Sequence, residues 1–438
     1  MDKYEIGLAM FFATLVLIAL RMPVSGAMLL AGGLGYASIS GWTPLLSAMK
    51  TMTYSKFASY SLSVLPLFLL MGEFATRGGM NSQLYRSARA WFGHWRAGLG
   101  VATIGGCAAF GAVCGSSLAT AATMSQVALP EMRKAGYSPA LATGTLAAGG
   151  TLGILIPPSI ILVIYAIYTE QSVGALFVAA VIPGLIAMLQ YMIVVNVYGR
   201  MVPGSAPRAE RASWGERLAT TKEVWPFLLL FALIVTGIYR GWFSPTEGAA
   251  VGAFASGVLA AWRGGMRLDG LLESLRATGQ TTAMLFLIML AAELFSAALA
   301  SSQLPAEIAR WVAQLRADPY TIVLCILLIY LVLGCFMESL SMVLLTLPVF
   351  VPLLLSLDFG LSSDAKLVWF GILVLMCVEI GMISPPFGLN LFLIKSMAGD
   401  VPMKEIYRGV LGFCVMDIVR VLLVLFIPVL ALWLPGLK

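Results

Sequence analysis

The chain has 438 residues, of which 60% are hydrophobic and only 11% are charged. A soluble domain carries about 25% charged residues, so this composition excludes a water-soluble globular protein. The mean hydropathy is +0.93, and apolar runs of about 20 residues recur along the whole chain, which predicts a polytopic helical membrane protein. The formal net charge of +6 comes from Lys and Arg in short loops. This distribution indicates membrane topology and argues against nucleic-acid binding.

The first half of the chain contains five apolar runs long enough to cross a bilayer. A mixed segment at 42–60 precedes the third run, and the segment at 81–97 is predicted to form an amphipathic helix at the membrane interface. The small-residue stretch that begins at Gly98 has a polar, glycine-rich centre, CGSSLATAAT, and predicts a re-entrant hairpin. The five runs lie at about 5–20, 23–40, 61–77, 139–169 and 174–199.

The fourth run contains the stretch GILIPPSIILVIY, with adjacent prolines at Pro157 and Pro158. Each proline lacks a backbone N–H and clashes with the preceding turn, at a cost of about 3 kcal/mol in a helix interior. The run is therefore predicted to be a broken helix, although a single copy of such a motif is also compatible with a simple kink.

The second half repeats this order. Glu73 in LMGEF corresponds to Glu293 in LAAELF, and Pro157 corresponds to Pro385 in GMISPPFGLNLFL, at an offset of roughly 220 to 230 residues. Two copies of a polar hairpin followed by a proline-broken helix argue strongly against the simple kink. A mixed segment lies at 266–279 and an amphipathic one at 305–316, and the apolar runs lie at about 224–240, 247–262, 280–300, 319–357 (interrupted by GCFMESLS), 366–394 and 409–434.

Five crossings in each half force the second half to be inverted. Lys and Arg crowd the loops that flank the first hairpin, so by the positive-inside rule this hairpin enters from the cytoplasm and the second from outside. The prediction is ten spans, two re-entrant hairpins and both termini outside, with Lys50, Lys56, Arg310 and Arg316 as outside exceptions. The expected domains are a first repeat at 1–199 (scaffold helices 1–60, hairpin and broken helix 98–169), a cytoplasmic linker at 200–223, and a second repeat at 224–438 (scaffold helices 224–279, hairpin and broken helix 319–394).

An inverted repeat with broken helices is typical of secondary transporters. Unwound backbone at membrane depth is tolerated only around protein or a wet cavity, and its carbonyls, with Ser or Thr hydroxyls, supply the oxygen ligands that Na⁺ needs. The first predicted Na⁺ site comprises Gly115, Ser116, Ser117, Thr120, Gly150, Thr151, Gly153 and Pro157, and the second Gly334, Met337, Glu338, Ser341, Gly381, Ser384, Pro385 and Gly388.

The acids of the second half are candidates for transport or for structure. Glu338 is a charge placed at membrane depth, which is costly and usually functional, although a neutral or ion-paired structural acid is the alternative. A structural role is favoured for Glu379, and Asp417 and Arg420 are expected to pair along one helix face. Half-helix N-termini face an anionic substrate, and the candidate substrate contacts are Ser117, Pro158, Glu338, Pro386 and Asn390.

Other functions lack their motifs. The sequence contains no GxxxxGK[ST] stretch for ATP and no HExxH metalloprotease motif, and no base lies near Ser116 and Ser117 in sequence, so an enzyme is the least favoured class. No cofactor is expected beyond Na⁺ as the coupling ion.

The quoted motifs GSSLATAAT, GILIPPSIILVIY, GCFMESLSMVLLTLPVFVPL and GMISPPFGLNLFL resemble the large membrane subunit of TRAP (tripartite ATP-independent periplasmic) transporters, within a wider superfamily of ion transporters. The resemblance covers essentially the whole chain. It implies an elevator-type, Na⁺-driven uptake of an organic anion such as a C4-dicarboxylate, sialic acid, a keto acid or a sulfonate. It implies a periplasmic substrate-binding protein and a four-helix membrane subunit, here expected as a separate polypeptide, in the bacterial inner membrane.

One departure from the family pattern concerns Glu338, where many relatives carry Asp. The longer side chain changes how this acid would reach an ion or the substrate. A stand-alone Na⁺- or H⁺-coupled carboxylate symporter of the same superfamily, which needs no binding protein, is the alternative to the tripartite transporter.

Overall fold

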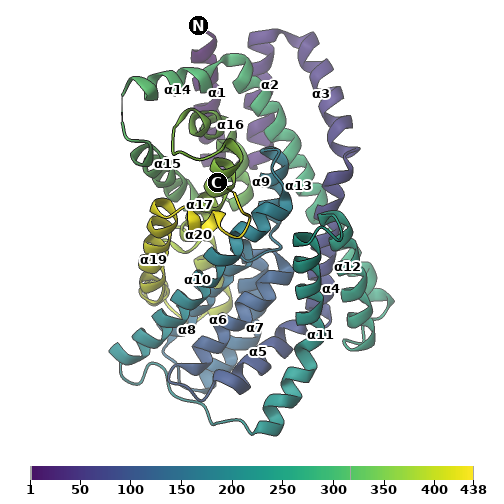
Figure 1. Ribbon diagram of the computed structural model, residues 1–438, viewed down its shortest axis with the longest axis vertical. Coiled ribbons are helices and arrows are strands. Elements are labelled where there is room, and N and C mark those ends of the chain that lie inside the picture. Colours follow the sequence, from purple (N-terminus) through teal and green to yellow (C-terminus); the bar gives the residue numbers. More distant parts are fainter. Residues whose placement is uncertain (1, 316, 438) are drawn as a thin grey trace.

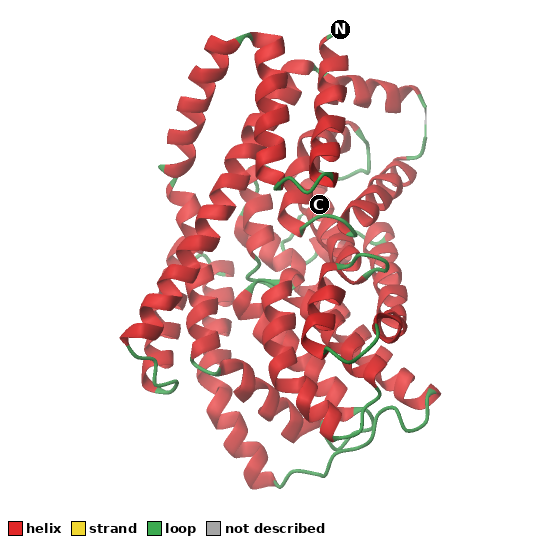
Figure 2. Ribbon diagram, turned by 180° about the vertical axis from the view of Figure 1, so that it is seen from behind, coloured by secondary structure: helices red, strands yellow, loops and turns green. Residues whose placement is uncertain are grey.

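The computed structural model describes residues 2–315 and 317–437, and within these two ranges it contains helices joined by loops and no strand (Figure 2). The chain is therefore an all-α polytopic membrane protein. Seven of its helices are long and apolar enough to span a bilayer, or eight if one bent pair is counted as a span. The ten predicted spans are not confirmed, because helices such as α2 (Val24–Ser40) are apolar but only 17 residues long.

The helices follow the predicted order in both halves (Figure 1). The first half contains α1 (Lys3–Ala19), α2, α3 (Trp42–Phe57), η1 (Tyr60–Ser63), α4 (Val64–Arg77), α5 (Met80–Phe92), α6 (Gly98–Cys114), α7 (Ser117–Lys134), α8 (Pro139–Leu155), α9 (Ile160–Tyr168) and α10 (Val173–Met201). The second half contains α11 (Trp214–Tyr239), α12 (Pro245–Trp262), α13 (Leu268–Ser302), α14 (Leu304–Gln314), α15 (Pro319–Gly334), α16 (Ser339–Ser356), α17 (Ser363–Ile383), α18 (Leu389–Ala398), α19 (Met403–Phe426) and α20 (Val429–Leu432).

Each half contains one helical hairpin and one broken helix. The hairpins are α6–α7 and α15–α16, and the broken helices are α8–α9 and α17–α18. Figure 1 places α6 and α7 in the lower half of the view and α15 and α16 in the upper half, so the two hairpins occupy opposite ends of the molecule. Around them, α8 and α17 are almost completely buried, whereas α11 exposes most of its surface to the surroundings.

The scaffold halves differ in a way that the hydropathy pattern does not predict. In the first half, α3 and the segment Tyr60–Arg77 are bent by 54° at a short break. In the second half, the expected boundary between 266–279 and 280–300 is wrong, because α13 runs unbroken for 35 residues. Residues 268–302 contain no proline, and their polar residues lower the hydropathy without interrupting the backbone hydrogen bonds of the helix.

The predicted linker at 200–223 is shorter in the structure. Helix α10 continues to Met201 and α11 begins at Trp214, with Ser213 as its N-cap, so residues 202–213 form the connection. Composition overestimates this loop because the first turns of α11 are charged and lie outside its apolar section.

Two of the exceptional positive residues have acidic partners. Lys56 lies 3.4 Å from Glu293 across the α3–α13 packing, and Arg310 pairs with Glu307 within α14. Lys50 is exposed on α3, and Arg316 lies outside the described residues.

Candidate functional site

The tip of the first hairpin packs against the first helix break. Gly115 ends α6 with φ +64°, and a Cβ at this position would lie 3.0 Å from the carbonyl oxygen of Pro158. The hydroxyl of Ser116 then accepts a hydrogen bond from the backbone N–H of Ala119 at 3.4 Å and caps α7. Glycine is thus required both for the left-handed turn and for the close approach of the two backbones.

Gly153 brings oxygen atoms of the hairpin to the last turn of α8. A Cβ on Gly153 would lie 2.6 Å from the Thr120 hydroxyl and 2.8 Å from the Ser116 carbonyl oxygen. Among the described residues, the buried Thr120 hydroxyl has no hydrogen-bond partner. A buried, unpaired hydroxyl beside a carbonyl is the donor set that a hard cation such as Na⁺ prefers, and it fits the first predicted ion site.

The second hairpin and break repeat the same backbone contact. Gly334 is the last residue of α15, and a Cβ on Gly381 of α17 would lie 2.6 Å from the Cα of Gly334. In the first half, a Cβ on Gly111 of α6 would lie 2.6 Å from the Cα of Gly153 in α8. Helix α17 ends at Ile383, and α18 begins five residues after Ser384. The two glycine pairs therefore seat the two hairpins on the two broken helices in equivalent ways.

Glu338 caps the second hairpin helix. Its carboxylate accepts hydrogen bonds from the Ser341 hydroxyl at 3.1 Å and from the Ser341 backbone N–H at 3.4 Å. It occupies the N-cap position of α16 that Ser116 occupies in α7. A negative charge is favourable at a helix N-terminus, so this acid is held in place by its own helix.

Asn390, in the first turn of α18, joins the second broken helix to the first repeat. Its side-chain N–H group donates to the Ser117 hydroxyl at 2.8 Å and to the Ala147 carbonyl at 3.0 Å. Asn390 is completely buried, and its side-chain oxygen has no hydrogen-bond partner among the described residues. The amide therefore retains one acceptor that points to no protein group.

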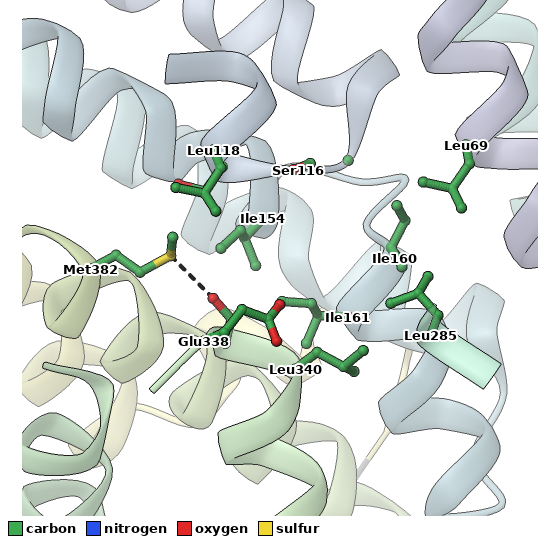
Figure 3. Close-up of a pocket in the computed structure, with 13 residues that line it drawn as sticks. Leu69, Ser116, Leu118, Ile154, Ile160, Ile161, Leu285, Glu338, Leu340 and Met382 are labelled. Atoms are coloured by element: carbon green, nitrogen blue, oxygen red, sulfur yellow. Dashed lines mark hydrogen bonds between the residues drawn. The ribbon is translucent and has the colours of Figure 1, made fainter. Parts of the chain in front are cut away.

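The two hairpin tips and the first helix break face one small cavity of about 100 Å³ (Figure 3). Leu69 of α4 and Leu285 of α13 close it from the scaffold side, and Glu338 is the one ionisable residue among its lining residues. Figure 3 shows the Glu338 side chain in this cavity, next to Ile161 and Leu340. The lining residues are Leu69, Gly115, Ser116, Ser117, Leu118, Ile154, Ile160, Ile161, Leu285, Glu338, Ser339, Leu340 and Met382.

The predicted site residues divide into two groups. Four of them line the cavity: Gly115, Ser116, Ser117 and Glu338. The others do not line the cavity, and most of them are buried, although Ser384 and Pro385 are half-buried. Pro386 is exposed, and its carbonyl accepts a hydrogen bond from the Tyr407 hydroxyl of α19 at 2.8 Å. Besides Pro386, the predicted residues outside the cavity lining are Thr120, Gly150, Thr151, Gly153, Pro157, Pro158, Gly334, Met337, Ser341, Gly381, Ser384, Pro385, Gly388 and Asn390.

The sequence pattern indicates only part of the environment of Arg420. The expected pair with Asp417 is present at 3.0 Å, but Arg420 also binds Glu379 of α17 at 2.7 Å. Asp417 in turn accepts a hydrogen bond from the Tyr191 hydroxyl of α10 at 2.8 Å. All four side chains are completely buried. Spacing on one helix reveals the i, i+3 pair, whereas no local signal indicates the partners from α10 and α17.

Most of the chain, and not only its hairpin motifs, matches a known family. The family model described as "Tripartite ATP-independent periplasmic transporter, DctM component" matches residues 11–430. The chain belongs to the DctM family of TRAP transporters. It is 38% identical over 378 residues, covering 86% of each chain, to a C4-dicarboxylate TRAP transporter large permease protein of Pseudomonas aeruginosa. It is 32% identical to a sialic acid TRAP transporter large permease of Vibrio cholerae, covering 97% of each chain.

Members of this family differ in their named substrates. An ectoine TRAP transporter large permease of Halomonas elongata is 30% identical to this chain, covering 97% of it and 98% of the relative. The chain is a transporter permease and not an enzyme, and a TRAP large permease works with a small subunit and a substrate-binding protein. Among solved structures, the YdaH transporter of Alcanivorax borkumensis shares the fold, with a TM-score of 0.64, 16% identity and 88% of each chain covered.

Proposed function

We propose that this DctM protein is the large permease subunit of a Na⁺-coupled, binding-protein-dependent importer of a small organic anion. The observation that carries the proposal is the cavity where the tips of both hairpins meet, with a close glycine–glycine contact between hairpin and broken helix in each half. The Thr120 hydroxyl and the Ser116 carbonyl beside Gly153 suit Na⁺, and a cavity lined by both hairpins and by scaffold leucines suits a transported solute.

The chemistry of the cavity favours an anionic group together with a cation. The N-termini of α7, α9 and α16, at Ser117, Ile160 and Ser339, all lie on it, and helix N-termini favour negative charge. The negative charge of Glu338 repels an anionic substrate. A bound Na⁺ would offset the charge of Glu338 when the substrate enters. The substrates named for relatives, which are C4-dicarboxylates, sialic acid, ectoine and isethionate, all carry a carboxylate or sulfonate group.

The test of Na⁺ coupling is uptake into vesicles that contain the permease and its small subunit, with the binding protein supplied outside. Uptake is expected to require external Na⁺. Ser117→Ala and Ser384→Ala are expected to raise the Na⁺ concentration for half-maximal uptake, because the first removes a hydroxyl at the first hairpin tip and the second removes one at the second helix break. Unchanged Na⁺ dependence in both variants would contradict the proposed sites. Uptake that ignores Na⁺ and follows the pH gradient would instead assign coupling to H⁺, with Glu338 as the carrier.

The same vesicles distinguish the tripartite transporter from a stand-alone symporter. Uptake by the permease that needs no binding protein would support the stand-alone alternative. Relatives in which the permease is part of a longer chain, such as a sialic acid TRAP transporter permease of Haemophilus influenzae of which this chain covers 67%, fit the proposed association with a small membrane subunit.

We also propose that transport occurs by an elevator movement in which the hairpins and broken helices slide along the scaffold. The Tyr168 hydroxyl of α9 lies 2.9 Å from the Ser296 hydroxyl of α13, and an elevator step would separate this pair. In a background with the native cysteines replaced, Tyr168→Cys with Ser296→Cys should be joined by a reducible bifunctional thiol reagent that spans the space left by the tyrosine ring, and this crosslink should stop uptake until a reductant cleaves it. Full uptake in verified crosslinked protein would refute the elevator.

The proposed location is the bacterial inner membrane with both termini in the periplasm. The connection at 202–213 then lies in the cytoplasm. A cysteine introduced at Arg208, which is exposed in this connection, should be labelled by a membrane-impermeant thiol reagent only after the inner membrane is opened. Labelling in intact spheroplasts would reverse the orientation.

A further inference from the structure

A continuous chain of buried polar contacts connects the two broken helices. The Thr151 hydroxyl of α8 lies 3.2 Å from the Tyr191 hydroxyl, which donates to Asp417 at 2.8 Å. Asp417 pairs with Arg420 at 3.0 Å, and Arg420 donates to Glu379 of α17 at 2.7 Å. All five side chains have an exposed fraction of 0%. We call this set of five residues the Tyr191 chain.

One end of the Tyr191 chain is a residue of the first predicted ion site, and the other end lies on the helix that carries part of the second. Thr151 is itself a residue of the first site, two positions before Gly153. Glu379 lies two positions before Gly381, whose backbone packs on Gly334 at the second site. The middle of the chain comes from α10 and α19, so helices of both repeats contribute to it. The proposed function above supplies two Na⁺ sites but no connection between them.

The Asp417 carboxylate fixes the direction of its hydrogen bond with Tyr191, because an ionised carboxylate can only accept. Tyr191 has a single O–H, and it donates to the Asp417 carboxylate. Tyr191 therefore cannot also donate to Thr151, and the single O–H of Thr151 is shared between the Ala148 carbonyl at 2.8 Å and the Tyr191 oxygen at 3.2 Å. A cation on the lone pairs of the Thr151 oxygen would polarise its O–H and strengthen its bond to Tyr191. Successive hydrogen bonds polarise one another, so this would also strengthen the bond from Tyr191 to Asp417.

At the Arg420 end, the Tyr191 chain transmits a shift in side-chain position rather than a change in hydrogen-bond polarisation. Arg420 lies between two carboxylates in a buried environment, where separating a charge from its partner is strongly unfavourable. If Glu379 shifts when backbone oxygens near Gly381 close on an ion, Arg420 and Asp417 must follow it. Such a movement shifts the Asp417 carboxylate, which accepts the hydrogen bond from Tyr191. The Tyr191 hydroxyl then moves, and the orientation of the Thr151 hydroxyl changes with it.

We infer that Tyr191 is a positioning residue that couples the two Na⁺ sites, so that an ion at one broken helix raises the affinity of the other. This inference rests on the proposed Na⁺ coupling. Coupling between sites is reciprocal and typically changes affinity by about 5- to 150-fold. Tyr191 needs no contact with either ion to have this effect.

The decisive variant is Tyr191→Phe. It removes the hydroxyl that links Thr151 to Asp417 but keeps the ring, which packs edge-to-face on Phe413 with ring centroids 5.3 Å apart. It leaves the Arg420 ion pairs untouched. The matched control is Tyr330→Phe, since Tyr330 is equally buried, and its hydroxyl contacts the Thr346 hydroxyl at 2.5 Å within the second hairpin alone.

The measurement is the melting temperature of the purified permease as Na⁺ replaces choline at constant ionic strength. The wild type and Tyr330→Phe should show a steep, cooperative dependence on Na⁺. Tyr191→Phe should show a shallow dependence with a Hill coefficient near one and a half-saturating Na⁺ concentration about fivefold higher or more.

Three outcomes have distinct meanings. Cooperative Na⁺ dependence that survives in Tyr191→Phe overturns the inference, as does loss of cooperativity in Tyr330→Phe to the same extent. Na⁺ stabilisation of the wild type without any cooperativity also overturns it, while leaving Na⁺ binding in place. Absence of any specific Na⁺ effect on the wild type refutes the proposed Na⁺ coupling itself.

Discussion

Asn390 of the second repeat donates a hydrogen bond of 2.8 Å to the Ser117 hydroxyl at the tip of the first hairpin. The two residues are 273 positions apart in the chain, and the contact closes the packing between one half of the protein and the other. Asn390 also holds the Ala147 carbonyl at 3.0 Å. A single amide thus fixes a hairpin tip and the two broken helices relative to one another.

Replacing Asn390 by Ala should therefore destabilise the protein. It leaves the buried acceptors on Ser117 and Ala147 without their donor, at about 1–3 kcal/mol for an unsatisfied buried group. Thermal unfolding of the purified variant checks this, and uptake should fall with it. The control is Asn196→Ala, whose amide bonds only to Met192 in its own helix and should change stability by less than about 0.5 kcal/mol. Equal effects of the two substitutions would contradict the role of Asn390.

Gly153→Ala should damage the first ion site. The added Cβ would lie 2.6 Å from the Thr120 hydroxyl and 2.8 Å from the Ser116 carbonyl, so the hairpin must move away from α8. We expect a loss of stability of about 1–3 kcal/mol and a weaker dependence of uptake on Na⁺. Gly279→Ala is the matched control, because it lies within α13 with open space around its α-carbon. This control should be neutral or stabilising by up to about 1 kcal/mol.

Glu338→Gln tests the acid in the cavity. Glutamine keeps a side-chain oxygen that can accept from the Ser341 backbone N–H, so the hairpin tip should still fold. We expect uptake to fall at least about tenfold, as for loss of a charged contact worth roughly 1.5–3 kcal/mol, with Glu338→Asp less affected. Glu307→Gln on α14, which loses only a surface pair with Arg310, is the control. Normal uptake by Glu338→Gln would exclude this acid from both ion and substrate binding.

The pair between Arg133 and Asp400 predicts a pH effect outside the membrane. Arg133 at the end of α7 donates to the Asp400 carboxylate at 2.6 Å and to the Ala398 carbonyl at 2.8 Å. The hydrogen bond from Arg133 lowers the pKa of Asp400 below its ordinary value of 3.8. A lowered folded-state pKa means that the stabilisation is present above the unfolded-state pKa and is lost as the pH falls through the folded pKa.

Asp400→Asn should accordingly melt at a lower temperature than the wild type at neutral pH, and the two proteins should converge in acid. Asp358→Asn is the control, since Asp358 accepts a local hydrogen bond from Gly360, and its effect should not follow the same pH course. A difference between wild type and Asp400→Asn that persists unchanged in acid would disprove the ionic contribution.

The elements that carry local signals are predictable from the sequence. Adjacent prolines break a helix wherever they occur, so Pro157 and Pro385 are enough to locate both breaks. Gly111 and Gly334 occupy corresponding positions in the two repeats and have the same role, each packed on a glycine of the following broken helix. One proline pair in a helix is a weak signal, but its recurrence after a polar hairpin in each repeat specifically predicts two broken helices.

What the sequence could not provide depends on packing between distant segments. Nothing near Asn390 indicates Ser117, and nothing near Arg420 indicates Glu379, because a buried polar group finds its partner through the fold rather than through spacing. The continuity of α13 is hidden for a different reason. Hydropathy reports what surrounds a helix, whereas helix continuity depends on backbone hydrogen bonds that polar residues leave intact.

The length of α13 has a geometric consequence. At 1.5 Å per residue, its 35 residues extend about 52 Å, while the hydrocarbon core of a bilayer is about 30 Å thick. Three of its four charged residues, Asp269, Glu273 and Arg276, fall in its first three turns, so we expect this end to reach water while the apolar part of the helix crosses the lipid. In the proposed elevator movement α13 belongs to the stationary scaffold, so the depth of the cavity in the bilayer would be measured against this helix.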